Sequence, residues 1–289
     1  MKQIRFAAPT SIDEAVGLLA EANGSARVLA GGTDLLVQLR SGMIRPELIV
    51  DIKQIPELRA VSSEDGGFRV GAAVAGAELG EHPEIPKVWP GIVEGFELIG
   101  STQIQGRASL GGNLCNASPA ADSVPAMIAA GVTCTIVGPG GTRDANVEDI
   151  VTGPGQTSLK NGEFIASFHL PARPANSGDA YLRFIPRTEM DIAVVGAGVS
   201  LTLDGDGTCT AARVSLGAVA PTALLVADCA SALIGTKLDD DAMANLAAAA
   251  SAACNPINDK RGTIEYRTKV AGVLARRAVG IAMERARSN

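Results

Sequence analysis

Val28-Leu29-Ala30-Gly31-Gly32-Thr33-Asp34 and Ala108-Ser109-Leu110-Gly111-Gly112-Asn113 are the most informative stretches of this 289-residue chain. Each places a Gly-Gly pair after a short apolar run and before a small polar residue. Glycine permits a positive φ and lets a ligand approach the backbone closely, because no Cβ intervenes. Successive N–H groups in such a turn form a concavity that binds anions. One such turn suits one phosphate, so the two together predict a pyrophosphate site.

Neither the two Gly-Gly pairs nor a third glycine-rich segment fits a standard nucleotide-binding motif. Neither Gly-Gly pair belongs to a G-x-x-x-x-G-K-[ST] loop, which indicates that phosphates are held rather than transferred. Gly196-Ala197-Gly198 is similar to the start of a dinucleotide fingerprint, but Leu201 stands where a third small residue belongs. We therefore predict that this segment is a strand running into a hairpin.

Composition and charge exclude several classes of protein. With 46% apolar residues and no uncharged apolar stretch of membrane-spanning length, the sequence indicates a soluble globular protein without a membrane span. A net charge of −6 without any basic tract argues against nucleic acid or an anionic membrane as partner. The first residues show no signal-peptide pattern, so we expect a cytoplasmic protein.

The cysteines and histidines do not suggest a metal site or a catalytic nucleophile. Five cysteines are present without a C-x-x-C spacing, and there are only two histidines. A zinc site or an iron–sulfur cluster needs about four closely spaced ligands. We therefore predict reduced structural cysteines, no metal and no catalytic residue in this chain, so that redox chemistry requires an organic cofactor or metal centres on another chain.

The predicted elements divide the chain into three units. A strand near residues 4–8, a helix capped by Ser11 and Glu14, and strands at 27–30 and 48–52 make a β-α-β unit over residues 1–57. The second unit, residues 58–175, has strands at 68–72, 132–137 and 164–170 and helices at 86–99 and 119–130. The stretch 171–178 is small, polar and proline-bearing, which is typical of a linker.

The third unit, residues 176–289, follows an α+β order. Strands are predicted at 180–184, 192–203 and 212–219, with a hairpin turn at Asp204-Gly205-Asp206-Gly207. Helices are predicted at 222–233, at 239–253 and from residue 263 onward. The sequence therefore predicts a three-stranded sheet followed by three helices.

Two charged residues leave alternatives open. Asp122 either caps a helix N-terminus or accepts hydrogen bonds from ribityl or ribose hydroxyls of a bound cofactor. Arg183 alternates with apolar residues in Tyr181-Leu182-Arg183-Phe184. It lies either on an exposed strand face or close to an electron-rich ring.

Six stretches match one known family in order along the chain. They are residues 30–35, 108–114, 117–122, 187–193, 216–222 and 259–267. Together they resemble the FAD-binding medium subunit of molybdenum hydroxylases, a family that includes carbon monoxide dehydrogenase, the FAD domain of xanthine dehydrogenase and bacterial N-heterocycle dehydrogenases. The resemblance implies a vanillyl-alcohol-oxidase-type FAD-binding fold of two α/β subdomains, followed by an α+β C-terminal domain.

The resemblance also implies the residues that bind FAD. The first loop would supply main-chain contacts from Val28, Leu29, Ala30, Gly31, Gly32, Thr33, Asp34 and Leu35. The second loop would contribute Ser109, Gly112 and Asn113. Asp122 would meet ribityl or ribose hydroxyls, and Ile165 would lie along the adenine or flavin edge. Arg183 takes a position where relatives carry Lys near the flavin, and Ile99 and Ile192 take positions where some relatives place an aromatic ring.

By the same resemblance, the chain is an electron-transfer subunit. A large molybdopterin subunit would oxidise the substrate, and a small subunit with two [2Fe-2S] clusters would pass electrons to FAD and on to an external acceptor. The assembly expected is a dimer of heterotrimers. A standalone FAD-dependent oxidoreductase of the same fold is the main alternative, and a non-catalytic nucleotide-binding module is a third.

Overall fold

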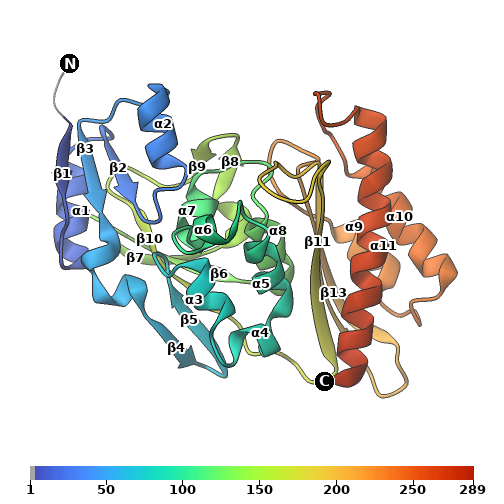
Figure 1. Ribbon diagram of the computed structural model, residues 1–289. Helices are drawn as coiled ribbons and strands as arrows, with labels where there is room; N and C mark the ends of the chain where they lie inside the picture. The colour runs from blue at the N-terminus through green and yellow to red at the C-terminus, as the bar shows by residue number, and fades with distance from the viewer. Residues whose placement is uncertain (1–3) are drawn as a thin grey trace.

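Three larger β-sheets and one two-stranded sheet make up the strands of the computed structural model, which describes residues 4–289 (Figure 1). The first is a parallel sheet of three strands in the order β1-β3-β2. Its strands are β1 (Arg5–Ala7), β2 (Ala26–Leu29) and β3 (Leu48–Asp51). The Ser11 hydroxyl accepts from the Glu14 N–H at the start of α1 (Ile12–Glu21), which confirms the predicted N-cap. Helix α2 (Leu35–Ser41), directly after the first Gly-Gly pair, has no buried residue.

The second sheet is antiparallel, with the strand order β4-β5-β10-β6-β7. Its strands are β4 (Val61–Glu64), β5 (Gly67–Gly71), β6 (Thr133–Gly138), β7 (Gly141–Asn146) and β10 (Phe164–Leu170). Short helical turns η1 (Ile52–Gln54), η2 (Pro56–Arg59) and η3 (Val147–Asp149) and the hairpin of β8 (Val151–Gly153) and β9 (Gln156–Thr157) connect the main elements. The predicted strands at 68–72, 132–137 and 164–170 are confirmed within one residue at their ends.

Six helices accompany this sheet. They are α3 (Gly76–Gly80), α4 (Ile85–Val88), α5 (Pro90–Glu97), α6 (Thr102–Gln105), α7 (Leu110–Cys115) and α8 (Ser123–Ala130). The single helix predicted over residues 86–99 is two helices, with a break at Trp89 (φ −129°, ψ 62°). Proline disfavours helical backbone at the residue before it but suits the first turn of a helix. Pro90 therefore ends α4 and begins α5.

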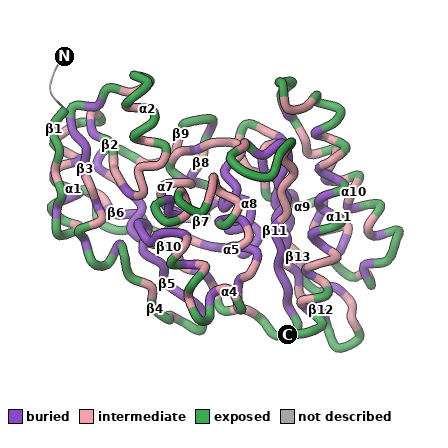
Figure 2. Tube along the Cα trace, in the orientation of Figure 1, coloured by how far each residue is buried: buried purple, intermediate pink, exposed green. Residues whose placement is uncertain are grey.

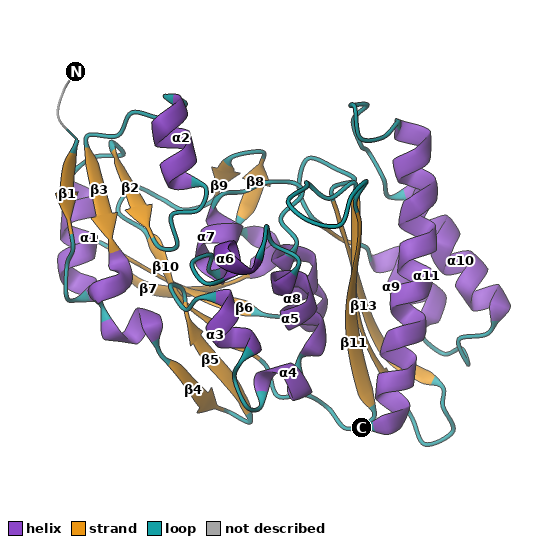
Figure 3. Ribbon diagram, in the orientation of Figure 1, coloured by secondary structure: helices purple, strands orange, loops and turns teal. Residues whose placement is uncertain are grey.

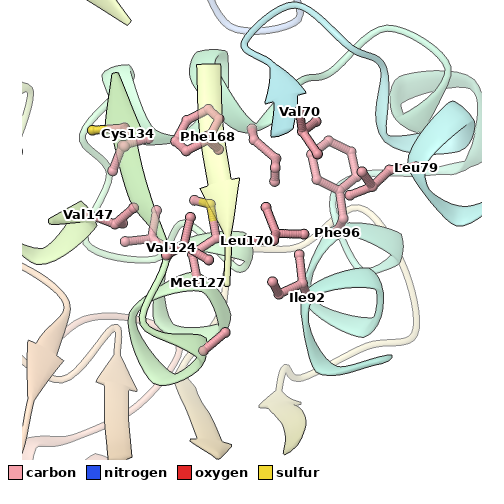
Figure 4. Packing of buried hydrophobic residues seen from close by; sticks show 14 of the residues in the cluster. Val70, Leu79, Ile92, Phe96, Val124, Met127, Cys134, Val147, Phe168 and Leu170 are labelled. Carbon is pink, nitrogen blue, oxygen red and sulfur yellow. The ribbon is translucent and has the colours of Figure 1, made fainter. Parts of the chain in front are cut away.

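The largest part of the core lies between these helices and the five-stranded sheet. Figure 4 shows Phe96, Ile92 and Leu79 pointing towards Val70 and Leu170 of the sheet. Every residue of α8 is buried, as expected of a helix that is apolar on all sides. A second layer must therefore cover the face of α8 that does not meet this core.

That second layer is an antiparallel four-stranded sheet with three helices, which we call the C-terminal layer. Its elements are β11 (Ser177–Phe184), β12 (Val195–Leu203), β13 (Cys209–Gly217), β14 (Leu224–Leu225), α9 (Ala227–Leu233), α10 (Asp240–Ala252) and α11 (Ile264–Ser288). The three-stranded prediction was wrong here, because residues 222–225 were assigned to a helix. A strand of two residues is too short to show the alternation that identifies strands.

Helices cover both faces of the four-stranded sheet (Figure 3). Helices α5 and α8 pack on one face, and α11 packs on the other. Gly198 lies in β12, where a Cβ would come within 2.5 Å of the Pro125 carbonyl oxygen on α8. The predicted strand at Gly196-Ala197-Gly198 is therefore confirmed, and its small residues allow a helix to approach the sheet closely.

Strand β11 is buried throughout its first half, as Figure 2 shows. Its alternate residues face two different neighbours. Ala180 and Leu182 pack in the apolar cluster with α11, whereas Asp179 and Tyr181 bond to groups of α5 and the loop before α8. Polar side chains on the second face therefore pair across the junction instead of facing water.

One of these junction groups is an ion pair between Arg173 and Asp179. Arg173 Nη1 lies 2.8 Å from Asp179 Oδ1, and Asp179 Oδ2 accepts from the Gly91 N–H at 2.7 Å. Burial raises the pKa of Asp179 to about 6, although Arg173 opposes the rise. Arg285 and Glu94 form a second ion pair beside it.

The raised pKa of Asp179 predicts how stability depends on pH. Because the folded protein binds this proton more tightly than the unfolded chain, the destabilisation is fully present above about pH 6 and decreases progressively as the pH falls from 6 towards the ordinary aspartate value of 3.8. We expect the melting temperature to rise between about pH 7.5 and about pH 5, and the rise to be smaller in Asp179→Asn. Thermal melts of both proteins across this range test it, and an equal rise in both would contradict it.

Candidate cofactor-binding site

The two Gly-Gly stretches line one cavity of about 720 Å³. Its lining comes from β2, the first loop and α2 on one side and from the segment around α7 on the other. The Gln38 side-chain amide on α2 donates to Asn116 Oδ1 just beyond α7, at 3.0 Å. Both side chains line the cavity, so this bond joins its two halves.

The first loop has the features that its sequence predicts. Gly32 has φ +81°, a backbone conformation that glycine adopts without strain. A Cβ on Gly31 would lie 2.0 Å from the Arg107 carbonyl oxygen, so the first loop packs directly on the segment before the second. Within residues 4–289, the N–H groups of Gly31, Gly32 and Thr33 have no protein acceptor. They are therefore free to donate to a ligand.

Lys53 supports this loop and was missed by the sequence analysis. Its ammonium donates to the Ala30 carbonyl at 2.9 Å and lies 2.7 Å from Asp51 Oδ1. This holds the carbonyl before Gly31 and places a positive charge behind the loop. The only signal in the sequence was a lysine just after a buried strand, which is too common to identify a role.

The second loop differs from the prediction, because Gly111 and Gly112 have no positive φ. Both lie in the helix α7, whose N-cap is Ser109. The Gly112 N–H donates to the Ser109 hydroxyl at 3.1 Å. Gly111 serves close packing instead, because a Cβ there would come within 2.7 Å of the Ala72 carbonyl oxygen.

Turns beyond the two loops complete the wall of the cavity. Gly155 and Gly162 both line it and have φ of +69° and +81°. The stretch from Leu159 to Ile165 follows the same wall. The sequence Gly153-Pro154-Gly155 by itself indicates only a turn, since nothing local shows that a turn faces a distant loop.

The structure brings most of the predicted site residues together. Those that line the cavity are Val28, Ala30, Gly31, Gly32, Thr33, Asp34, Leu35, Ile99, Ser109, Gly112, Asn113 and Ile165. Leu29, Asp122 and Arg183 do not line it. Their direct contact with a cofactor stays a prediction.

Asp122 and Arg183 instead form a buried pair behind the cavity wall. Arg183 Nη1 lies 2.8 Å from Asp122 Oδ2, and the two side chains are 3% and 7% exposed. The Tyr181 hydroxyl donates to Asp122 Oδ1 at 2.8 Å. Burial raises the pKa of Asp122 to about 6 against the opposing effect of Arg183, and it raises the pKa of Tyr181 well above its usual value.

The surroundings of these two residues decide part of what each does. An exposed strand face for Arg183 is wrong, because its side chain is buried. Asp122 takes the N-cap position of α8, but its side chain makes no capping hydrogen bond. Its carboxylate bonds instead to Tyr181 and Arg183 of β11.

A cavity of this size, with free N–H groups on a glycine loop, defines the class of proteins that hold a phosphate-bearing cofactor. The model of the FAD binding domain in molybdopterin dehydrogenase matches residues 2–173, and that of the CO dehydrogenase flavoprotein C-terminal domain matches residues 180–282. The chain belongs to the family of FAD-binding subunits of molybdenum hydroxylases. Its cofactor is FAD, and the free N–H groups of Gly31, Gly32 and Thr33 at the cavity are donors of the kind from which a phosphate accepts.

Two relatives of this chain are named as a medium chain and as an FAD-binding subunit of dehydrogenases. The carbon monoxide dehydrogenase medium chain of Afipia carboxidovorans is 35% identical over 280 residues, which cover 97% of this chain and 96% of the relative. A putative xanthine dehydrogenase FAD-binding subunit of Escherichia coli K12 is 35% identical over 214 residues, 73% of each chain.

Solved structures agree over almost the whole length. Reconstituted CO dehydrogenase from Oligotropha carboxidovorans matches with a TM-score of 0.94 and 34% identity, covering 98% of both chains. Quinoline 2-oxidoreductase from Pseudomonas putida 86 matches with a TM-score of 0.90 and 28% identity, also over 98% of both. The α+β fold with an FAD-binding region and a C-terminal domain is thus confirmed.

Two further findings concern residues 4–289. None of the helices there is both long and apolar enough to cross a membrane. The same residues contain no group of three His, Cys, Asp or Glu side chains arranged to hold a metal ion.

Proposed function

We propose that this chain is the FAD-bearing electron-transfer subunit of a heterotrimeric molybdenum hydroxylase. The observation that carries the proposal is the convergence of both Gly-Gly stretches on one cavity, in a chain that matches named subunits of such enzymes over nearly its full length. The proposed division is residues 1–57 and 58–175 for binding FAD and residues 176–289 for the C-terminal domain.

The chain's own residues bind and orient the cofactor. The free N–H groups of Gly31, Gly32 and Thr33 would hold the pyrophosphate, with Lys53 fixing the loop behind them. Ser109 and Asn113 would act from the facing helix, and Ile99 and Ile165 would supply apolar walls. FAD, when bound, accepts and releases the electrons, so the protein contributes its placement and surroundings.

The proposed partners are a small subunit with two [2Fe-2S] clusters and a large molybdopterin subunit, in a dimer of heterotrimers, with an external electron acceptor. The chain's relatives support an assembly, since they are named as medium chains, FAD-binding subunits or complex subunits. We place the small subunit near residues 99–102, because Ile99 lines the cavity and Ser101 and Thr102 are partly or fully exposed beside it.

Affinity purification of the tagged chain from cells that express it naturally tests this function. We expect bound FAD together with iron, acid-labile sulfide and molybdenum in the same complex. A yellow protein that purifies alone would contradict the proposal and support a standalone FAD-dependent oxidoreductase. A colourless protein would support the non-catalytic alternative.

We also predict that FAD is bound without a covalent link. The nearest candidate for attachment is Cys115, which lines the cavity at the end of α7. Desolvation by the surrounding protein raises the pKa of its thiol even though the residue keeps exposed surface, so the nucleophilic thiolate is scarce at neutral pH. Acid precipitation should release all the flavin into the supernatant, in the wild type and in Cys115→Ser alike. Flavin that stays in the wild-type pellet but not in the Cys115→Ser pellet would contradict this.

A further inference from the structure

The C-terminal domain reaches the FAD cavity without lining it. Within the described part of the chain, the residues that line the cavity end at Ile165, before this domain begins. Arg183 of β11 nevertheless bonds to the segment immediately behind one cavity wall. The domain therefore has a contact through which it can affect the cofactor indirectly.

The contact is made at the end of α5. Arg183 Nη1 donates to the Leu98 carbonyl at 2.7 Å. Leu98 is the C-cap residue of α5, where helix carbonyls carry partial negative charge and a cation is stabilising. The next residue, Ile99, lines the cavity. The guanidinium therefore fixes the backbone from which the Ile99 wall extends.

The same guanidinium is held in place by Asp122. The Asp122 carboxylate accepts from Arg183 at 2.8 Å and from the Tyr181 hydroxyl at 2.8 Å. The following residue, Ser123, donates through its hydroxyl to Asn113 Oδ1 at 2.7 Å, and Asn113 lines the cavity from the opposite helix. Residues 122 and 123 are thus linked to two separate cavity walls.

We propose that Arg183, Asp122 and Tyr181 form a positioning unit by which the C-terminal domain fixes the Ile99 wall of the FAD cavity. The inference rests on the proposed function, since FAD is the group that this wall meets. Removing the guanidinium leaves the Leu98 carbonyl without this donor and Asp122 buried without its cation. A buried charge without a partner is strongly unfavourable, so the local backbone must shift or Asp122 must take up a proton.

The Arg173–Asp179 pair provides a matched control. It lies at the same junction, includes a residue of the same strand, and is similarly buried, with side chains 9% and 4% exposed. Arg173 also bonds to a backbone carbonyl, that of Val88, but neither Val88 nor Gly91 lines the cavity. Arg173→Met therefore removes a comparable interdomain pair while leaving the Ile99 wall intact.

The test is FAD affinity, measured by flavin fluorescence on refolded apoprotein well below each variant's melting temperature. We expect Arg183→Met to weaken binding at least about ten-fold, which corresponds to about 1.4 kcal/mol. Arg183→Lys should stay within about three-fold of the wild type, because an ammonium can still donate to Leu98 and Asp122. Arg173→Met should bind FAD within about two-fold of the wild type, even if its melting temperature falls as far as that of Arg183→Met.

A second readout is the visible circular dichroism of FAD-saturated protein, which reports the surroundings of the flavin. It should change in Arg183→Met and not in Arg173→Met. If Arg183→Met does not fold, Tyr181→Phe removes one hydrogen bond to Asp122, with Tyr266→Phe at a residue that is 43% exposed as its control. Only Tyr181→Phe should weaken FAD binding, by about three-fold.

Equal FAD affinity of Arg183→Met and the wild type would overturn the inference. Equal weakening in Arg183→Met and Arg173→Met would also overturn it, because the effect would then be general destabilisation of the junction. Failure of the proposed function is a separate outcome: the wild-type chain itself would bind no FAD.

Discussion

Gly31→Val is expected to reduce FAD affinity at least about a hundred-fold, or about 2.7 kcal/mol. The added Cβ would lie 2.0 Å from the Arg107 carbonyl oxygen and 2.7 Å from its carbon. These are backbone atoms, and the Arg107 N–H is itself bonded to the Ile104 carbonyl at 2.9 Å. The neighbouring segment therefore cannot yield as a flexible side chain would. The two loops must separate, and the cavity between them loses its shape.

A graded series tests this explanation by fluorescence titration with FAD. Gly32→Ala should have an intermediate effect, because it places a side chain at φ +81° and its Cβ meets flexible side chains, those of Leu29 at 2.8 Å and Leu36 at 3.4 Å, rather than backbone. Gly17→Ala is the control, since nothing lies within 4 Å of its Cβ. Binding by Gly31→Val as tight as that by Gly17→Ala would show that the loops do not meet as described.

Phe96→Ala is expected to lower the free energy of unfolding by about 3–5 kcal/mol. Phe96 is 1% exposed and lies at the centre of the main core, among the side chains drawn in Figure 4. Its ring occupies the space where a Cβ on Gly76 would lie, only 1.6 Å from the nearest ring carbon. Because the ring packs against backbone at α3, the surroundings cannot close the cavity that the substitution leaves.

Urea denaturation followed by far-ultraviolet circular dichroism measures this loss. The matched control is Phe6→Ala on β1, where the side chain is 62% exposed and the change should be within about 0.5 kcal/mol. A loss in Phe96→Ala no larger than that in Phe6→Ala would contradict the packing shown for α3 and α5.

Local sequence signals predicted the main elements because each depends on neighbouring residues. Ser11 and Glu14 identified the start of α1, and alternating or continuous apolar runs identified β5, β6 and β10. The apolar spacing over residues 86–99 predicted one helix, and Pro90 within it divides that stretch into two. The two-residue strand β14 was missed, because its pairing with β13 defines it and its composition does not. The exact ends of several other elements were missed as well.

Gly32 of the first Gly-Gly pair was predictable for the same reason, since its positive φ is a local property of the chain. The second pair was not, because Gly111 is small in order to accommodate Ala72, which lies far away in the sequence. A glycine required for close packing between distant segments looks the same in the sequence as a glycine required for a tight turn. The turns at Gly155 and Gly162 line the cavity for a similarly non-local reason.

The sequence by itself determined the family, the first glycine turn and the longer strands and helices, since these are encoded in short motifs and local periodicity. Only the tertiary structure decided the surroundings of Asp122 and Arg183. They are 61 positions apart and meet because α5 and α8 cover the face of β11 that would otherwise be exposed. Alternation along a strand shows that two faces differ, but it cannot show whether water or another element covers the polar one.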